Sequence, residues 1–271
     1  MHPASHRPIG VFDSGVGGLT VLKALRRRLP GESTIYLGDT ARVPYGTKSA
    51  EVVTRYSLMN ARMLARNDIK LLVVACNTSS AVALPRMQEQ LEIPVVGVIE
   101  PGAKVAATVS RSGRIGVIGT PGTIDSGAYQ KAIARFRPGA TVLAQACPLF
   151  VPLAEEGWTT GDVPGAVARH YLREIAESDI DTLVLGCTHY PLLRDTISAA
   201  VEDRLALVDS AEATAEEVAV LLMTQDLLRT GGLVEHRYLV TDTPLLFARV
   251  GSRFLGEPIV NAERVDVLFE D

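Results

Sequence analysis

The chain has 271 residues, 47% of them hydrophobic, and its 27 lysines and arginines against 31 aspartates and glutamates give a formal net charge of −4. This length is enough for one large or two smaller domains, and the slightly acidic balance disfavours nucleic acid as a partner. No apolar run reaches the roughly 18 residues of a membrane span and residues 1–8 lack a signal-peptide core, so we expect a cytoplasmic protein with no membrane partner.

Short apolar runs separated by amphipathic stretches predict that strands and helices alternate along the chain. The helical stretches are Leu19–Leu29, Ser49–Arg66 and Pro164–Ser178. Such alternation is typical of a doubly wound parallel sheet, in which ligands bind outside the carboxyl ends of the strands. The predicted strands are Ile9–Phe12, Thr34–Leu37, Leu71–Ala75, Val95–Val98, Ile115–Ile118, Thr141–Ala144, Thr182–Leu185 and Leu205–Val208.

Two parts of the chain resemble one another. The runs I-G-V-F-D-S-G (9–15) and I-G-V-I-G-T-P-G (115–122) each begin one half, and a cysteine follows at a similar distance in both. Starts of parallel strands can look alike by chance, but the matching cysteine positions favour a related pair. The sequence therefore predicts an α/β fold of two pseudo-symmetric, doubly wound parallel-sheet domains with the active site in the cleft between them.

The C-terminal part shows no obvious chemistry in its sequence. A helical pattern runs from Ala211 to Arg229, and short apolar runs follow at Tyr238–Thr241 and Val265–Phe269. We expect this part to return to the first unit and to make that domain discontinuous. The predicted domains are residues 1–97 together with 209–271, and residues 98–208.

Cys76 and Cys187 lie in the matching frames V-V-A-C-N-T-S-S (73–80) and V-L-G-C-T-H-Y-P (184–191). Each cysteine follows a strand-like run and precedes residues that begin helices. The free N–H groups and the dipole at a helix N-terminus stabilise a thiolate over a thiol. Two such cysteines predict one base and one acid on opposite sides of a substrate, which is what inversion at a weakly acidic carbon requires.

Short polar groups adjoin these turns and a glycine-rich turn near the N-terminus. In Asp13-Ser14-Gly15-Val16-Gly17-Gly18 the glycines can let the backbone approach a ligand, although a tight turn with Asp13 as a helix cap is the alternative. Tyr45 and Gly46 can offer an O–H and a backbone N–H to a carboxylate. Further donors, which could also be ordinary helix caps, are Asn77, Thr78, Thr188 and His189. Together these groups suit a small, doubly charged, amine-bearing substrate.

The remaining titratable groups predict chemistry without a cofactor. Three cysteines with no secretion signal indicate free thiols. The sequence does not favour a metal site, because it has no C-x-x-C motif, no H-E-x-x-H motif and no close Cys/His cluster. Lys104, the nearest candidate for a Schiff-base lysine, lies early in a predicted helix. Cys147 lies in an apolar run and is predicted to be buried. Glu155 and Glu156 could bring a carboxylate to the cleft, or could simply be solvated.

Six motifs in this order resemble the cofactor-independent glutamate racemases, and with the tail V-T-D-T-P…F-L-G-E-P (240–258) the resemblance covers nearly the whole chain from Ile9. It implies conversion of L-glutamate to D-glutamate for peptidoglycan, with Cys76 and Cys187 as the acid–base pair. Residues 1–8 fall outside the resemblance and are expected to be disordered. The motifs are G-V-F-D-S-G-V-G-G-L-T (10–20), Y-L-G-D-T-A-R-V-P-Y-G (36–46), A-C-N-T-S-S-A (75–81), G-V-I-E-P-G (97–102), C-P-L-F-V-P-L-A-E-E-G (147–157) and G-C-T-H-Y-P-L-L (186–193).

The same resemblance implies roles for the groups around the two cysteines. It implies supporting roles in catalysis for Asp13, Glu155 and His189. Because Glu156 adjoins Glu155, the sequence does not decide which of these two carboxylates acts. We expect a homodimer with a small-molecule substrate and neither metal nor cofactor. The implied substrate contacts are Asp13, Ser14, Tyr45, Gly46, Asn77, Thr78, Thr188 and His189.

Two alternatives to a glutamate racemase stay open from the sequence alone. One is an aspartate or hydantoin racemase of the same two-cysteine superfamily, against which Thr188-His189 and the full D-S-G-V-G-G run argue. The other is a regulatory or interaction protein on a racemase fold, since the resemblance implies that some members bind DNA gyrase. This sequence gives no support for a gyrase partner, and the complete pair of cysteines argues against lost catalysis.

Overall fold

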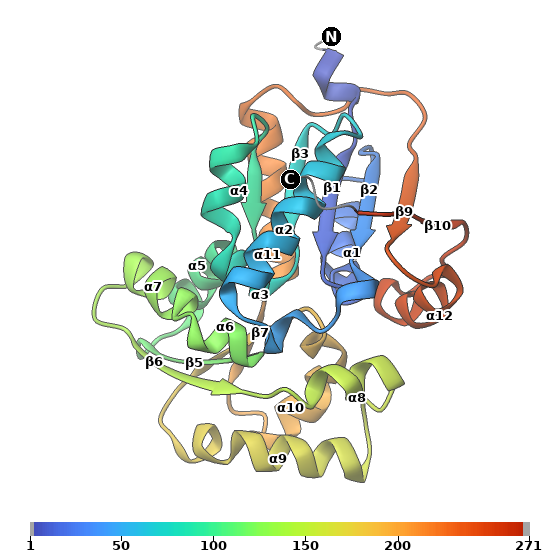
Figure 1. The fold of residues 1–271 in the computed structure, drawn as a ribbon. Coiled ribbons are helices and arrows are strands. Elements are labelled where there is room, and N and C mark those ends of the chain that lie inside the picture. Colours follow the sequence, from blue (N-terminus) through green and yellow to red (C-terminus); the bar gives the residue numbers. More distant parts are fainter. Residues whose placement is uncertain (1–2, 268–271) are drawn as a thin grey trace.

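A first parallel sheet of six strands forms one part of the molecule. The fold comes from a computed structural model, which describes residues 3–267. The order of the strands is β10-β9-β2-β1-β3-β4, and each neighbouring pair is parallel (Figure 1). The strands are β1 Ile9–Asp13, β2 Thr34–Gly38, β3 Leu71–Val74, β4 Val95–Gly97, β9 His236–Val240 and β10 Ala262–Arg264.

A second parallel sheet repeats the central order of the first. Its order is β6-β5-β7-β8, which corresponds to β2-β1-β3-β4. All eight predicted strands therefore form, with bounds within two residues of the prediction, and the predicted α/β fold is confirmed. Cys76 follows β3 and Cys187 follows β7, which are the equivalent strands of the two sheets. The strands are β5 Arg114–Gly119, β6 Thr141–Ala146, β7 Thr182–Gly186 and β8 Ala206–Asp209.

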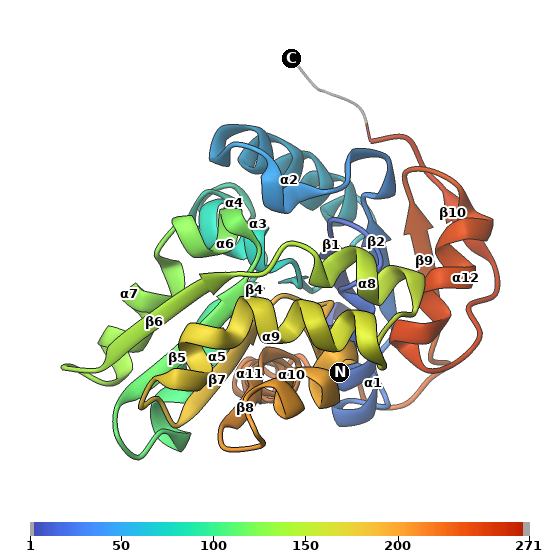
Figure 2. The same cartoon turned by 90° about the horizontal axis from the view of Figure 1, so that it is seen from below.

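Helices flank both sheets, with α8 and α9 on the side of the second unit that Figure 2 brings to the front. Local chemistry sets several helix starts, because Ser49 and Thr120 accept N-cap hydrogen bonds and proline occupies the first turn of α6 and α12. The helices are α1 Leu19–Arg28, α2 Ala50–Ala65, α3 Asn77–Val82, α4 Leu84–Gln90, α5 Ile99–Val109, α6 Pro121–Asp125, α7 Ala128–Phe136, α8 Phe150–Glu156, α9 Asp162–Glu177, α10 Arg194–Ala200, α11 Ser210–Thr224 and α12 Pro244–Leu255. Short 3-10 turns are η1 Pro3–His6, η2 Thr40–Arg42, η3 Tyr45–Thr47 and η4 Tyr190–Leu193.

The helix predicted to reach Arg229 ends five residues earlier, at Thr224, so this prediction was wrong at its C-terminal end. The helix ends because Asp226 adopts a left-handed φ of 55° and the N–H of Leu227 returns to the carbonyl of Leu222 at 2.8 Å. A buried ion pair follows, in which Lys70 Nζ lies 2.5 Å from Glu32 Oε2. Lys70 also donates to the carbonyl of Leu227, and the backbone N–H of Arg229 donates to Glu32 Oε1, so the ion pair holds the segment after the helix on the first unit.

The same ion pair orders the N-terminal segment that was expected to be disordered. Lys70 Nζ donates to the carbonyl of Ser5 at 2.8 Å, and η1 forms there. The expectation was therefore wrong for residues 3–8, while residues 1–2 lie outside the described part of the chain. Of the run Val265–Phe269, residues 265–267 follow β10 and the N–H of Val265 donates to the carbonyl of Val240 in β9 at 2.8 Å, while residues 268–269 lie outside the description.

The C-terminal part returns to the first sheet, where β9 pairs with β2 and β10 pairs with β9. Between the units, α11 packs against both α1 and α5. We propose the domain division given by the sequence, residues 1–97 with 209–271 and residues 98–208, because each part then holds one sheet. Within the described residues, no helix is both long enough and apolar enough to span a membrane.

Candidate active site

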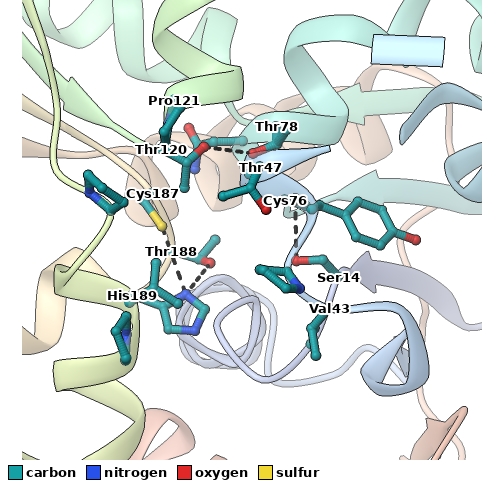
Figure 3. A pocket seen from close by; sticks show the side chains of 18 of the residues that line it. Ser14, Val43, Thr47, Cys76, Thr78, Thr120, Pro121, Cys187, Thr188 and His189 are labelled. Carbon is teal, nitrogen blue, oxygen red and sulfur yellow. Dashed lines mark hydrogen bonds between the residues drawn. The ribbon is translucent and has the colours of Figure 1, made fainter. Parts of the chain in front are cut away.

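A cavity of about 320 Å³ lies where the carboxyl ends of strands from both sheets meet, a size suited to a small molecule. Cys76 and Cys187 lie on opposite sides of it (Figure 3). The structure thus brings together nearly all of the side chains that the sequence singled out. Those that line the cavity are Ser14, Tyr45, Gly46, Cys76, Asn77, Thr78, Glu155, Cys187, Thr188 and His189, and Asp13 alone lies behind the lining.

Cys76 lies at the N-cap position of α3, one residue after β3. Its Sγ donates to Ser14 Oγ at 3.6 Å. Burial, followed by the charge of Asp13, raises the pKa of Cys76 to about 11 and outweighs the hydrogen bonds from Ser79 and Ser14 that favour the thiolate. The N–H groups at the start of α3 do lower this pKa, as predicted, but burial outweighs them, so the predicted net lowering was wrong. A raised pKa favours the protonated form of Cys76.

Cys187 follows β7 directly and faces an imidazole that is held at both nitrogens. His189 Nδ1 lies 3.8 Å from Cys187 Sγ, and Nε2 lies 2.9 Å from Glu155 Oε1. Burial alone would lower the pKa of His189, but the hydrogen bonds and negative charges of Cys187 and Glu155 raise it to about 10. The sequence left open whether Glu155 or Glu156 acts beside the cysteines. Glu155 contacts His189 and lines this cavity, whereas Glu156 does not line it.

Asp13 ends β1 beneath the cavity lining and is 1% exposed. Its Oδ2 accepts the N–H of Gly15 at 2.9 Å, whereas Oδ1 has no hydrogen-bond partner among the described residues. Burial raises the pKa of Asp13, against the lowering effect of the His189 charge. The helix-cap alternative does not form, since α1 begins after Gly18 without a side-chain cap.

Close packing explains two of the glycines after Asp13, against the second unit at Gly17 and within the first unit at Gly18. A Cβ on Gly17 would lie 2.5 Å from His189 Cε1 and closer still to Thr188 Oγ1. A Cβ on Gly18 would lie 2.5 Å from the Cβ of Asp13. Of these three glycines only Gly15 lines the cavity, so the close approach to a ligand stays a prediction for Gly15.

The Tyr45 hydroxyl does not point to the cavity, contrary to prediction. It donates to Asp39 Oδ2 at 2.5 Å, and its side chain is 1% exposed. Asp39 also accepts from Arg42 at 2.7 Å and from Thr241 at 2.8 Å, so its carboxylate joins the loop after β2 to the C-terminal part. The neighbouring Gly46 keeps its predicted place in the lining.

A threonine cluster on the cavity wall joins the two units. Thr78 Oγ1 lies 2.9 Å from Thr120 Oγ1 and 3.2 Å from Thr123 Oγ1. Sequence reasoning missed Thr120, although the internal repeat held the signal, because Thr120 follows β5 as Ser14 follows β1. Asn77 accepts the Tyr129 hydroxyl at 2.7 Å, and its Nδ2 has no partner among the described residues.

Cys147 is fully buried within the hydrophobic core, as predicted, and its Sγ approaches only the carbonyl of Gln145, at 3.8 Å. Burial raises the pKa of this thiol far above its ordinary value. It therefore has neither the access nor the charge state of a reactive cysteine.

The lining combines two thiols, one imidazole and one carboxylate with many neutral donors, and no lysine or arginine is among the lining residues. Within residues 3–267, no three His, Cys, Asp or Glu side chains are grouped so as to hold a metal ion. The arrangement can exchange protons with both faces of a small substrate held between Cys76 and Cys187.

Comparisons with known proteins agree on one family. A family model described as Asp/Glu/Hydantoin racemase matches residues 9–218. A glutamate racemase from Geobacter metallireducens is 60% identical over 96% of this chain and 97% of its own. A crystal structure of glutamate racemase from Francisella tularensis in complex with D-glutamate has a TM-score of 0.92 at 39% identity, covering 97% and 98% of the two chains. The Thermus thermophilus enzyme, in complex with beta-chloro-D-alanine, has a TM-score of 0.88 at 47% identity over 97% and 98%.

Proposed function

The chain belongs to the Asp/Glu/Hydantoin racemase family, and we propose that within this family it interconverts L- and D-glutamate. The observation that carries the mechanism is the pair of thiols on opposite walls of one small cavity. The observation that carries the substrate is full-length similarity to proteins named glutamate racemases, one of them 60% identical. The aspartate or hydantoin and regulatory alternatives are not favoured by these relatives.

The reaction exchanges the proton on Cα of glutamate for another on the opposite face. One thiolate takes the α-proton and becomes a thiol, while the second thiol gives its proton to the other face of the planar carbanion and becomes a thiolate. The raised pKa of Cys76 supports a resting state in which Cys76 is the proton donor. As the resemblance implies, removal of the L-enantiomer's α-proton is assigned to Cys187, and that of the D-enantiomer to Cys76.

Neutral donors and one imidazolium would hold the two carboxylates of the substrate. The unpartnered Nδ2 of Asn77, the hydroxyls of Thr78 and Thr188, and the backbone N–H of Gly46 are the candidates. His189 lies between Cys187 and Glu155, where it can shuttle a proton to the sulfur or stabilise its charge. As the resemblance implies, the D-glutamate product would serve peptidoglycan synthesis, and we keep the proposal of a cytoplasmic homodimer.

The test is formation of D-glutamate from L-glutamate without any added cofactor. Cys76→Ala and Cys187→Ala should each abolish racemisation, because inversion needs both faces served. In D₂O, early D-glutamate should carry deuterium at Cα while the remaining L-glutamate stays mostly protiated. Early product that kept much of its original hydrogen would contradict the two-thiol mechanism, and turnover of L-aspartate in place of L-glutamate would contradict the substrate.

A further inference from the structure

Helix α12 lies in the C-terminal part, outside the stretch matched by the family model, yet it reaches the candidate active site. Figure 1 and Figure 2 both show it beside β9 and β10 of the first sheet. The Phe254 ring is 2% exposed and meets the His189 ring edge to face, with centroids 5.1 Å apart and planes at 77°. This helix therefore forms one wall around the imidazole.

A second contact from α12 reaches the carboxylate partner of that imidazole. Arg253 Nη1 donates to the backbone carbonyl of Glu155 at 3.0 Å. Glu155 lies in the last turn of α8, where carbonyls lack partners within the helix and a cationic donor is favourable. A Cβ on Gly157, the residue that ends α8, would lie 2.8 Å from Arg253 Nη1, so the guanidinium fits closely over this turn.

The helix that carries both contacts is fixed to the first unit. Its Gly251 packs so closely on α1 that a Cβ there would lie 2.6 Å from Leu19 Cδ1. Phe247 is 1% exposed and packs on Tyr36 of β2, with ring centroids 5.9 Å apart. Because α12 is anchored in this way, Phe254 and Arg253 give fixed reference points in the first unit for two side chains of the second.

We propose that Phe254 and Arg253 are positioning residues, which hold the Glu155–His189 pair in line with Cys187 across the boundary between the two units. Phe254 limits the position of the imidazole ring, and Arg253 fixes the turn that presents the Glu155 carboxylate. Neither residue touches the reacting carbon, since neither lines the cavity. This inference rests on the proposed glutamate racemase function for its kinetic readout only.

The kinetic test compares Phe254→Leu with Phe247→Leu, a matched control that removes an equally buried ring from the same helix. Both variants should lose stability to a similar extent in urea denaturation. Since misplacing a catalytic group by about 1 Å costs on the order of 100-fold, Phe254→Leu should lower kcat about 10- to 100-fold, a larger factor than any rise in KM. Phe247→Leu loosens the anchor of α12 without removing the ring that contacts His189, so it should lower kcat by a smaller factor than Phe254→Leu.

A spectroscopic test reads the position of His189 without any turnover. The groups that face its ring are Cys187, Glu155 and, at longer range, Asp13. Nitrogen-15 NMR of labelled histidine, with the signal assigned from His189→Gln, should show the His189 titration moving toward its solution value further in Phe254→Leu than in Phe247→Leu.

Arg253 is tested in the same way, since its contact with Glu155 is exposed and its loss should leave the fold intact. Arg253→Met should shift the His189 titration toward the solution value, and Arg253→Lys should restore part of the shift because it keeps a donor. If the wild type did not racemise glutamate, the proposed function would fail. The His189 titration in the variants would still decide whether Phe254 and Arg253 are positioning residues, because it needs no turnover. Equal kcat losses and equal titrations in Phe254→Leu and Phe247→Leu would overturn the role of Phe254, and an unshifted titration in Arg253→Met would overturn that of Arg253.

Discussion

Gly17→Ala should separate the two units at the active site without disturbing the backbone of its own turn. Gly17 has no left-handed φ, so alanine can adopt its conformation. The added Cβ, however, would lie 2.5 Å from His189 Cε1, where ordinary contacts begin at about 3.4 Å. The ring and the Gly17 turn must therefore move apart by about 0.9 Å, the difference between these two distances.

A displacement of this size falls on the residue that links Glu155 to Cys187. Loss of alignment by about 1 Å costs on the order of 100-fold in rate, so we expect kcat to fall by that factor. The new methyl group also meets the Thr188 hydroxyl, a proposed substrate donor, at still closer range. KM should therefore rise while kcat falls.

The assay is steady-state racemisation of both enantiomers, followed by circular dichroism. Gly31→Ala is the control, because nothing lies within 4 Å of a Cβ at Gly31. A Gly17→Ala protein with wild-type kcat would show that the units separate without moving His189, and the reasoning from close approach would be refuted. An equal loss of kcat in Gly31→Ala would refute it as well.

Cys147→Ala should keep racemase activity and lose about 1 kcal/mol or somewhat more of unfolding free energy in urea, since it removes a buried group from the core; loss of activity in a folded protein would assign Cys147 a role in the site. Folded His189 titrates near 10 and an unfolded histidine near 6.5, so its charge stabilises the fold fully below pH 6.5, and this stabilisation is lost as the pH rises through 10. Glu155→Gln removes one of the groups that raise this pKa, so its stability deficit relative to wild type should be larger at pH 6 than at pH 9, and an equal deficit at both pH values would contradict the ion pair. Dialysis against a strong chelator should leave activity unchanged, and activity restored only by zinc would show a metal requirement.

Much of the fold follows from local patterns in the sequence. The strands are buried runs bounded by turn residues, so their periodicity and length identify them without tertiary information. Cys76 and Cys187 could be paired because each ends a strand of its own half, and the carboxyl ends of parallel strands collect ligand-binding groups. The supporting roles of Glu155 and His189 came from the resemblance, and the structure supplies the contact between them.

What the sequence could not predict depends on contacts between distant segments. The Tyr45 hydroxyl is taken by Asp39, which local sequence does not reveal because Asn60 and Thr241 complete that hydrogen-bond network. The pKa of Cys76 depends on how completely the thiol is removed from water, and its position at a helix N-terminus gave the wrong sign. Phe254 begins the run F-L-G-E-P of the C-terminal tail, but nothing in that run indicates its contact with His189.

The repeated strand order gives the two cysteines equivalent places, but their neighbours are unlike. Cys187 faces an imidazole with a carboxylate partner, whereas Cys76 faces the hydroxyl of Ser14. Two mirror-image amino acids have the same free energy in water, so an enzyme that interconverts them must have equal kcat/KM in both directions. The asymmetry can then appear only in how each direction divides that ratio. The enantiomer with the lower KM must also have the lower kcat, by the same factor.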